Sequence, residues 1–555
     1  MTLAAIPGSA AEHTRRGLRS LFSILVLGVF LSGCASLRGK EVEPMGAAAA
    51  EFTFEQYEVV TGSARRQTVL TGFLLGGPFV ELAVVNMDEN GDRRLRIYAF
   101  GDGTWVRRLD AMLGPNVLFV DVANIGGRDR LITYQPGRLN WFDPESATEQ
   151  ELVGVASNCI LPRRGEIPHL DVTRDVNADG RDDLVVPEVD GFRVFVQMST
   201  PMIDRMGEGA FADPVKLGPS IERDRIYDAN GYRFNPWGQS RIHEMDYNQD
   251  GRSDLVFWNE DHLEVHTQDE RGLFAPVAET FTIDVAFDSD DLASLAVPRR
   301  DRRRRSDYVV SGDMTGRVLH SLTDMNGDGV ADLVVFSLKG GSGRFFGQRG
   351  ELGGMRSTYE VHFGTPRPDG GTVFPPHAGT AIKSDGIPFG MEQHDFDQDG
   401  QVDMMYTIIN IGFFKVIGLL IDSLLTGSAS PLDLEFYRME GGLYPDKRTA
   451  KRKIKVVSPG KSARRASILP SVMIGDVDGD NRSDLLVQEL RKELQVFLGV
   501  PGPDLFARKP LRVAVAMPNE EYTWLVDLNK DGKQDILMHH PSTTKPHRVT
   551  MLIAR

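Results

Sequence analysis

The residues best suited to chemistry in this chain are aspartates that recur at fixed spacing in six short loops. Each loop reads Asp-x-Asp/Asn-x-Asp-x-x-x-Asp and is followed at once by an apolar segment. Carboxylates at positions 1, 3, 5 and 9 of a tight turn, with a backbone carbonyl at position 7, can supply the roughly six to eight oxygens that Ca²⁺ requires. The spacing therefore predicts calcium as the cofactor, with about six ions bound.

The predicted ligands occupy the same five positions in every copy. Position 1 is Asp175, Asp246, Asp324, Asp395, Asp476 or Asp527. Position 3 is Asn177, Asn248, Asn326, Asp397, Asp478 or Asn529, and position 5 is Asp179, Asp250, Asp328, Asp399, Asp480 or Asp531. Position 7, through its carbonyl, is Arg181, Arg252, Val330, Gln401, Arg482 or Lys533. Position 9 is Asp183, Asp254, Asp332, Asp403, Asp484 or Asp535.

An apolar residue at position 12 separates these loops from the EF-hand, which needs a bidentate Glu there and a helix on each side. The flanking segments are short and apolar, so each loop is predicted to join two β-strands. Position 6 is glycine in five copies and Asn481 in the other, and both residue types tolerate the left-handed backbone of a sharp turn. An ordinary Asx-rich turn is the alternative for a single copy, whereas six matching copies favour calcium.

Each loop belongs to a longer repeated unit. Two more strand-like segments follow the loop hairpin, as in GFRVFVQ after the first loop and ELQVFLG after the fifth. Four antiparallel strands per unit predict an all-β fold built from β-propeller blades. The units resemble FG-GAP/VCBS repeats, the blades of integrin alpha-subunit propellers and of many bacterial surface proteins. The resemblance covers nearly all of residues 50–555 and implies calcium in the hairpin between the first two strands of a blade.

Two further units keep the strands without the acidic loop. Residues 68–86 retain only Glu81, and residues 118–142 retain Asp121 and Asp129. With these two, eight loop hairpins are expected, and eight blades are favoured over the seven of integrins. The last unit has only three strands, at 522–527, 535–540 and 548–554, so the alternating segment 51–60 is predicted to close the ring as its missing outer strand.

Long insertions are predicted on the face opposite the acidic loops, at residues 207–240, 286–316, 366–390 and 408–431. Ligand contact is expected there, because binding residues usually lie on loops carried by a rigid scaffold. Within the last insertion, residues 411–427 have apolar side chains at helical spacing and are predicted to form a short helix, packed over the ring or facing a partner or membrane.

Two basic stretches and four histidines also stand out. Residues 299–307 and 447–457 are interpreted as solvated loops, with lipid headgroups or an anionic polysaccharide as the alternative contact. His169, His243, His320 and His394 lie in or near the first strands of their blades at unequal offsets from the loops, so a structural role is favoured.

The first 33 residues are predicted to be a bacterial lipoprotein signal peptide, with a basic start and an apolar stretch at 21–31. Residues 31–34, Leu-Ser-Gly-Cys, resemble a lipobox, which implies acylation of Cys34 and, with Ala35 following, an outer-membrane location. Residues 34–50 would form the lipidated tether and 51–555 a single propeller domain. Cys159 is the only other cysteine, so no internal disulfide is possible, and the net charge of −15 argues against nucleic acid as a partner.

No complete catalytic motif is present. G-x-S-x-G is absent, Gly460-Lys461-Ser462 lacks the first glycine of a P-loop, and His243-Glu244 lacks the second histidine of H-E-x-x-H. The chain is therefore predicted to be a non-catalytic binding or scaffold protein with a protein or glycan ligand. The alternatives are a purely structural envelope subunit or a calcium-dependent polysaccharide lyase, whose candidate residues would be His243, His377, Tyr227, Tyr232 and Arg241.

Overall fold

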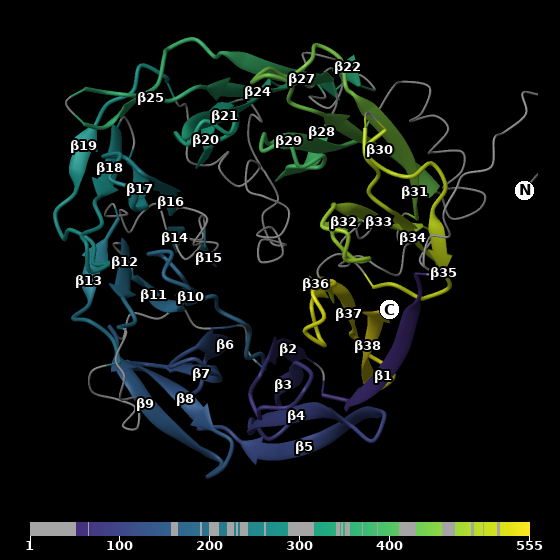
Figure 1. Cartoon of the computed structure of the whole chain (residues 1–555). Coiled ribbons are helices and arrows are strands. Elements are labelled where there is room, and N and C mark those ends of the chain that lie inside the picture. Colours follow the sequence, from purple (N-terminus) through teal and green to yellow (C-terminus); the bar gives the residue numbers. More distant parts are fainter. Residues whose placement is uncertain are drawn as a thin grey trace, which may run out of the picture. The chain divides into compact units, whose positions relative to one another are not determined.

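The computed structural model shows eight four-stranded antiparallel sheets that form the blades of a β-propeller (Figure 1). The structure describes residues 52–555 except 65, 157–161, 163–164, 189–190, 199–209, 219–226, 229–230, 233–241, 260–261, 287–315, 340–343, 346–347, 350–355, 369, 386, 410–428, 458–471, 490–492, 503 and 519–521. This part is all-β and contains no α-helix, and the helix predicted at 411–427 lies outside it. Accordingly, none of the described residues belongs to a helix that could cross a membrane.

In each blade the strands are hydrogen-bonded in the order A, B, C, D from the inner edge outward (Figure 1). Blade one contains β2 (Gln67–Gly72), β3 (Glu81–Met87), β4 (Arg93–Gly101) and β5 (Thr104–Met112). Blade two contains β6 (Phe119–Asn124), β7 (Asp129–Gln135), β8 (Arg138–Asp143) and β9 (Thr148–Gly154). Blade three contains β10 (Thr173–Arg174), β11 (Asp183–Glu188), β12 (Gly191–Phe195) and β13 (Val215–Leu217). Blade four contains β16 (His243–Met245), β17 (Asp254–Asn259), β18 (His262–His266) and β19 (Glu279–Phe281).

The second half of the ring repeats this arrangement. Blade five contains β20 (Gly316–Thr323), β21 (Asp332–Lys339), β24 (Arg356–His362) and β27 (Thr380–Asp385). Blade six contains β28 (Ile387–His394), β29 (Asp403–Ile409), β30 (Ala429–Tyr437) and β31 (Ala450–Val457). Blade seven contains β32 (Val472–Gly475), β33 (Asp484–Glu489), β34 (Glu493–Phe497) and β35 (Leu511–Val513). Blade eight contains β36 (Thr523–Val526), β37 (Asp535–His540), β38 (His547–Ala554) and β1 (Phe54–Gly62).

The N-terminal strand closes the ring. β1 pairs antiparallel with β38, with Phe54 opposite Ala554 and Val60 opposite Arg548. Ion pairs of Arg555 with Glu55 at 2.6 Å and of Arg548 with Glu58 at 3.0 Å lie along the same seam. The prediction that the segment 51–60 supplies the missing outer strand is therefore confirmed, and the blade count is eight rather than seven.

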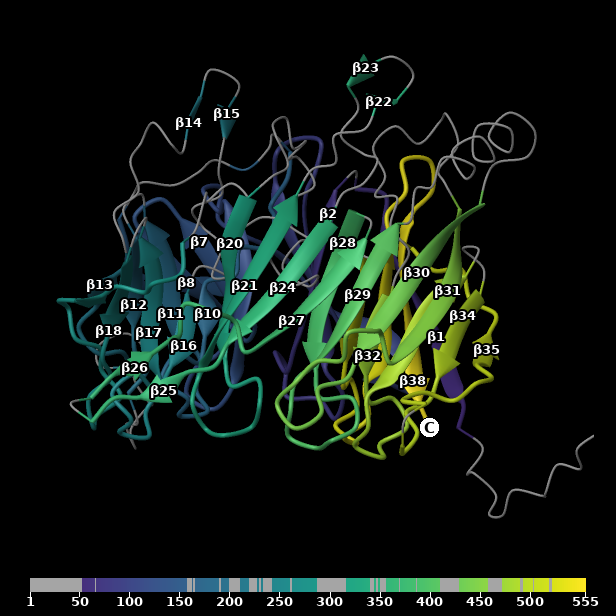
Figure 2. The same ribbon diagram turned by 90° about the horizontal axis from the view of Figure 1, so that it is seen from above.

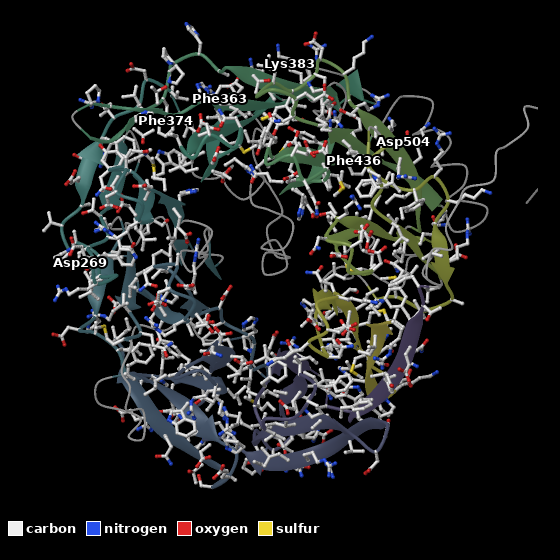
Figure 3. The ribbon with its side chains drawn as sticks, in the orientation of Figure 1. Asp269, Phe363, Phe374, Lys383, Phe436 and Asp504 are labelled. Carbon is white, nitrogen blue, oxygen red and sulfur yellow. The ribbon has the colours of Figure 1, made fainter. Side chains whose placement is uncertain are left out.

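The hydrophobic core lies between the blades. Strand B of a blade packs against a neighbour on both faces, which is why it reads as a continuous apolar run: all six residues of β11 are buried. In Figure 3 side chains fill the spaces between blades, and Phe436 of β30 packs against Phe396 and Phe506 between blades six and seven. Complete burial of one such side chain contributes roughly 1.5–3 kcal/mol, so the ring rests on many equivalent interfaces.

The connections sort onto two faces. The A–B loops and C–D connections lie on one side, here called the loop face, and the B–C and D–A connections lie on the other, here called the opposite face. Figure 2 shows the small hairpin of β25 (Thr365–Pro366) and β26 (Thr372–Val373) on the loop face. The hairpins of β14 (Tyr227–Asp228) with β15 (Gly231–Tyr232), and of β22 (Arg344–Phe345) with β23 (Gln348–Arg349), project from the opposite face.

The placement of two insertions was wrong. Within 207–240, β13 (Val215–Leu217) is the outer strand of blade three, so residues 210–214 precede strand D instead of connecting blade three to blade four. Residues 366–390 were expected to connect blade five to blade six on the opposite face. Instead, β27 is the outer strand of blade five, so residues 363–379 form a C–D connection on the loop face. The Gly364 N–H donates to Asp332 of the acidic loop at 2.8 Å, which fixes this side. The strand ends that flank residues 287–315 and 410–428 do lie on the opposite face, as predicted.

Candidate cation sites

Each acidic loop forms the turn between strands A and B of its blade, in blades three to eight. The backbone enters the left-handed region twice, at position 4 and at position 6. Position 6 has φ between 65° at Asn481 and 87° at Gly532, as its residue types predicted. Position 4 is equally left-handed although its residue is not glycine in four of the six copies, with φ of 58° at Ala178 and 59° at Lys530. The loop thus accepts local backbone strain to fold its acidic side chains inward.

Backbone amides hold the position 1 carboxylate in place. In the first loop, Asp175 accepts the N–H of Asp179 at 3.0 Å and that of Gly180 at 2.8 Å. The position 6 amide makes the same bond in all six loops, including Asn481 to Asp476 at 2.8 Å. These bonds orient the carboxylate without balancing its charge.

The position 9 aspartate is the first residue of strand B and is completely buried in all six loops. One carboxylate oxygen accepts the N–H of position 2, as in Val477 to Asp484 at 2.8 Å. The other accepts an N–H from the C–D connection, as in Gly499 to Asp484 at 2.7 Å. The six acids therefore tie the loop to the rest of its own blade.

Burial is the main cause that raises the pKa of each position 9 aspartate, and neighbouring loop carboxylates raise it further. The pKa rises from 3.8 to about 7 for Asp183, Asp403 and Asp484. It rises to about 6 for Asp254, Asp332 and Asp535. Among the described residues, basic side chains pair with position 5 or position 3 rather than with position 1 or 9. These carboxylates are therefore electrostatically unbalanced by the protein alone.

Position 5 is placed differently from positions 1 and 9. Its carboxylate accepts the position 7 N–H, as in Arg482 to Asp480 at 2.8 Å, and the guanidinium of the same arginine also contacts it at 2.9 Å. Arg181 and Arg252 make the equivalent contacts with Asp179 and Asp250. Position 5 is exposed in these three loops, and the position 7 guanidinium partly balances its charge.

The acids converge most closely in the two loops that have aspartate at position 3. Oxygens of Asp395, Asp397 and Asp403 in blade six all lie within 4.8 Å of one another, and the same holds for Asp476, Asp478 and Asp484 in blade seven. Three or more carboxylate oxygens at this separation suit a hard cation. In the other four loops the position 3 asparagine donates to the position 5 carboxylate, as in Asn177 to Asp179 at 3.0 Å.

Blade six contains an additional cationic group. Nη1 of Arg438, at the end of strand C, lies 3.0 Å from Oδ2 of Asp397. The other oxygen of Asp397, Oδ1, is buried and has no hydrogen-bond partner. Burial raises the pKa of Asp397, as do its acidic neighbours, while Arg438 lowers it. This contact could not be predicted from the sequence, because Arg438 is 41 residues from Asp397.

Blades one and two lack the acidic loop but keep acidic residues at positions equivalent to some of its aspartates. Glu81 also begins a strand B and is buried, but its carboxylate accepts the N–H groups of Leu74 at 2.7 Å and Gly77 at 2.9 Å. Asp129 begins β7 and accepts the N–H of Phe73 at 2.8 Å, while Asp121 lies 2.6 Å from His169. Protein donors thus contact the acid in these two blades, and the prediction that neither blade binds calcium stays a prediction.

The remaining predicted residues do not come together. His169, His243, His320 and His394 belong to four different blades, and none of them contacts another. Of the residues considered for a lyase, His377 is exposed in a C–D connection on the loop face. Tyr227 and Tyr232 lie on the opposite face, and Arg241 lies outside the described residues.

Much of the second basic stretch has an internal role. Lys451 pairs with Asp433 at 2.8 Å and with Glu435 at 3.1 Å. The Arg452 guanidinium lies 4.2 Å from the ring centroid of Phe497 and donates to the carbonyl of Ala507 at 2.8 Å. These contacts favour structural cations over a polyanion site. The first basic stretch, 299–307, the signal peptide and Cys34 lie outside the described residues.

No protein-family model matches the chain, and no curated protein matches its sequence. Similar solved structures include a biofilm matrix protein of V. cholerae, at 11% identity and TM-score 0.31, covering 91% of each chain. A rhamnogalacturonan lyase of Bacillus licheniformis has 12% identity and TM-score 0.32, with 93% of this chain and 78% of that chain covered. The Tc holotoxin pore of Photorhabdus luminescens has 13% identity and TM-score 0.27; 85% of this chain is covered, and it spans 17% of the toxin chain. Similarities this low say nothing about activity or ligand.

Proposed function

We propose that this protein is a calcium-stabilised, lipid-anchored scaffold or binding protein of the bacterial cell envelope, and that it is not an enzyme. The observation that carries the proposal is the set of six buried position 9 aspartates, each at the base of an acidic loop on one face of the ring. A bound Ca²⁺ in each loop would supply the positive charge that these carboxylates lack. Calcium would therefore be a structural cofactor.

The acidic loops are linked to their neighbours, which extends the effect of a cation beyond one blade. The Val402 N–H in the blade-six loop donates to the Met325 carbonyl in the blade-five loop at 2.8 Å. The Gln534 N–H in blade eight donates to the Asp476 carbonyl in blade seven, also at 2.8 Å. A cation that fixes one loop would therefore also fix the inter-blade bond beside it.

The first strand of the described residues starts at the loop face. β1 begins at Phe54, opposite Ala554, and the Ala554 N–H donates to Asp535 of the blade-eight loop at 2.8 Å. The chain therefore enters the propeller at the loop face. We propose that an acyl group on Cys34 anchors the protein to the membrane and that the opposite face, where β14–β15 and β22–β23 project, binds a protein or glycan ligand.

The dispersal of the candidate catalytic side chains supports a non-catalytic role. A lyase needs a base and charge-neutralising groups beside one substrate, whereas His377 and the two tyrosines Tyr227 and Tyr232 belong to opposite faces of the ring.

The test compares thermal unfolding of the mature protein in calcium and in chelator, with magnesium as the matched cation control. We expect a lower melting temperature in chelator and recovery with calcium but not with magnesium. A melt that chelator leaves unchanged would contradict the calcium assignment. For the anchor, we expect wild-type protein in the outer-membrane fraction and Cys34→Ala in the soluble fraction, and equal fractionation would contradict it.

Ligand binding is tested separately, by capture on the immobilised mature protein followed by identification of bound proteins and glycans. In the comparison variant, a Gly-Ser linker replaces residues 410–428, which connect strand ends on the opposite face. We expect a specific ligand that is lost in this variant and retained when exposed loop-face residues such as Lys447 are changed to Ala. Cleavage of a captured polysaccharide by the wild-type protein would overturn the non-catalytic assignment.

A further inference from the structure

Two buried histidines face each other where blade eight meets blade one. Nδ1 of His547, at the start of β38, lies 3.3 Å from Nε2 of His539 in β37. The exposed fractions of the two residues are 1% and 2%. The ring of Tyr522, just before β36, packs edge-on against His539 with centroids 5.7 Å apart. The proposed calcium function does not involve these residues.

The pair lies beneath the strand that closes the ring. His547 is paired with Gly62 at the end of β1. Strand alternation places both imidazoles on the same side as Leu537, Val549 and Met551, which pack against blade one in the shared core cluster. Any change that enlarges or repels the pair would therefore act directly on the contact between blades eight and one.

The groups that line this part of the seam from other strands are mostly neutral. β1 contributes Thr61, whose hydroxyl donates to the side chain of Gln67 of β2 at 2.6 Å. β3 contributes Asn86, which is 2% exposed and has a buried Oδ1 without a hydrogen-bond partner. β4 contributes Arg96, whose guanidinium donates to the Thr61 carbonyl at 2.8 Å and lies close to Gly62.

No carboxylate among the described residues is free to balance a charged imidazole here. Asp110 of β5, on this side of blade one, already accepts Arg94 at 2.5 Å and Arg107 at 2.9 Å and lies 3.9 Å from Arg96. Glu58 and Arg548 pair with each other on the other side of blade eight. There His540 lies 3.1 Å from Thr550, and Lys545 in the turn before β38 is exposed.

We propose that the His539–His547 pair is an acid-sensitive latch on ring closure, which holds when both imidazoles are neutral and opens the seam at β1 and β38 when they take up protons. A neutral pair shares one N–H···N hydrogen bond. When both rings are protonated, both facing nitrogens are N–H donors, so no hydrogen bond can form and the two positive charges repel each other. The uncompensated charge would also be buried. The inference does not depend on calcium.

Burial, which is the largest effect, lowers the pKa of His539 from 6.5 to about 3 and also lowers the pKa of His547 and His540. A folded-state pKa below the unfolded value means that the stabilisation is complete above about pH 6.5 and is lost as the pH falls towards 3. His266 and His362 are also buried, but each faces a backbone carbonyl, of Ala275 and Pro375, at 2.8 Å and has no imidazole partner. They are an internal comparison in blades four and five.

The experiment is hydrogen–deuterium exchange of the mature protein at pH 7.5 and pH 5.0, corrected for intrinsic rates and performed in both calcium and chelator. We assume one histidine that has a pKa of about 6.5 when the seam is open and stays neutral when it is closed. The equilibrium constant for opening β1 and β38 should then be about 30-fold larger at pH 5.0 than at pH 7.5. β30 and β33, in blades that lack a buried histidine pair, should change less than about threefold. In His539→Phe/His547→Leu, the extra exchange at the seam should disappear.

Because the double variant could fail to fold, His547→Gln provides a second test, since it removes one titrating ring and retains a polar side chain. The proposal would be overturned if β1 and β38 lost no more exchange protection between pH 7.5 and pH 5.0 than β30 does. It would also be overturned if both variants kept the additional loss of protection at β1 and β38. Extra loss that occurs in calcium and not in chelator would also overturn it, because acid would then act through the cation sites. The same comparison separates failure of the latch from failure of the calcium proposal.

Discussion

Replacement of one position 9 aspartate by asparagine should have opposite effects on stability with and without calcium. Asp484 is fully buried, and burial raises its pKa from 3.8 to about 7. Above pH 7 its ionisation in the metal-free protein therefore costs up to about 4 kcal/mol, which is the free-energy equivalent of raising the pKa from 3.8 to about 7. Asparagine avoids this cost, but its NH2 leaves one of the two backbone N–H donors, of Val477 or Gly499, unpaired at a cost of about 1–3 kcal/mol. It also removes a charged ligand from the proposed cation site.

We therefore expect Asp484→Asn at pH 8 to be more stable than wild type in chelator, by roughly 1–3 kcal/mol once the unpaired N–H is subtracted, and less stable in millimolar calcium. At pH 4 in chelator, where the folded-state aspartate is protonated, this advantage should be lost. The assay is urea unfolding followed by far-UV circular dichroism. The matched control is Asp129→Asn in blade two, which also begins a strand B but should respond equally in both buffers. Equal destabilisation of Asp484→Asn in both buffers would refute the reasoning.

Three further outcomes follow from the same contacts. Arg438→Leu removes the cation 3.0 Å from Asp397 and should tighten calcium binding in blade six by about 5–10-fold in isothermal titration, whereas weaker binding would show that Arg438 instead positions Asp397. Glu81→Gln leaves a buried N–H unpaired and should cost about 1–3 kcal/mol equally with and without calcium, and a calcium-dependent cost in urea unfolding would contradict its assignment. Val59→Asp places a charge in the buried side of β1 and should expose 52–62 to limited proteolysis, which unchanged cleavage would disprove.

The blade architecture could be predicted from sequence because each acidic loop marks the start of a strand B, and the strand that follows is apolar on both faces. Ring closure by β1 could be predicted because the last unit visibly lacked a fourth strand. β27 was missed because TAIKSD, with its alternating polar residues, resembles a loop more than an outer strand. The position 4 residues were missed for a related reason, since alanine, glutamine and lysine carry no signal for a left-handed backbone.

The contacts that modify the candidate sites were beyond the sequence because they join residues that are distant in the chain. Arg438 meets Asp397 only after strands B and C of blade six have paired, and His539 meets His547 only in the observed register of β37 and β38. Glu81 was recognised as a remnant of the repeat, but its backbone donors were visible only in the folded loop.

The most direct test of the central claim is to measure the calcium bound per chain by elemental mass spectrometry. The sample is mature protein that has been equilibrated with calcium and then separated from the free ion. Wild type should retain about six ions per chain, in line with its six acidic loops, and Asp484→Asn should retain about one fewer. Protein that retains no calcium, and that unfolds at the same urea concentration in calcium and in chelator, would contradict the account.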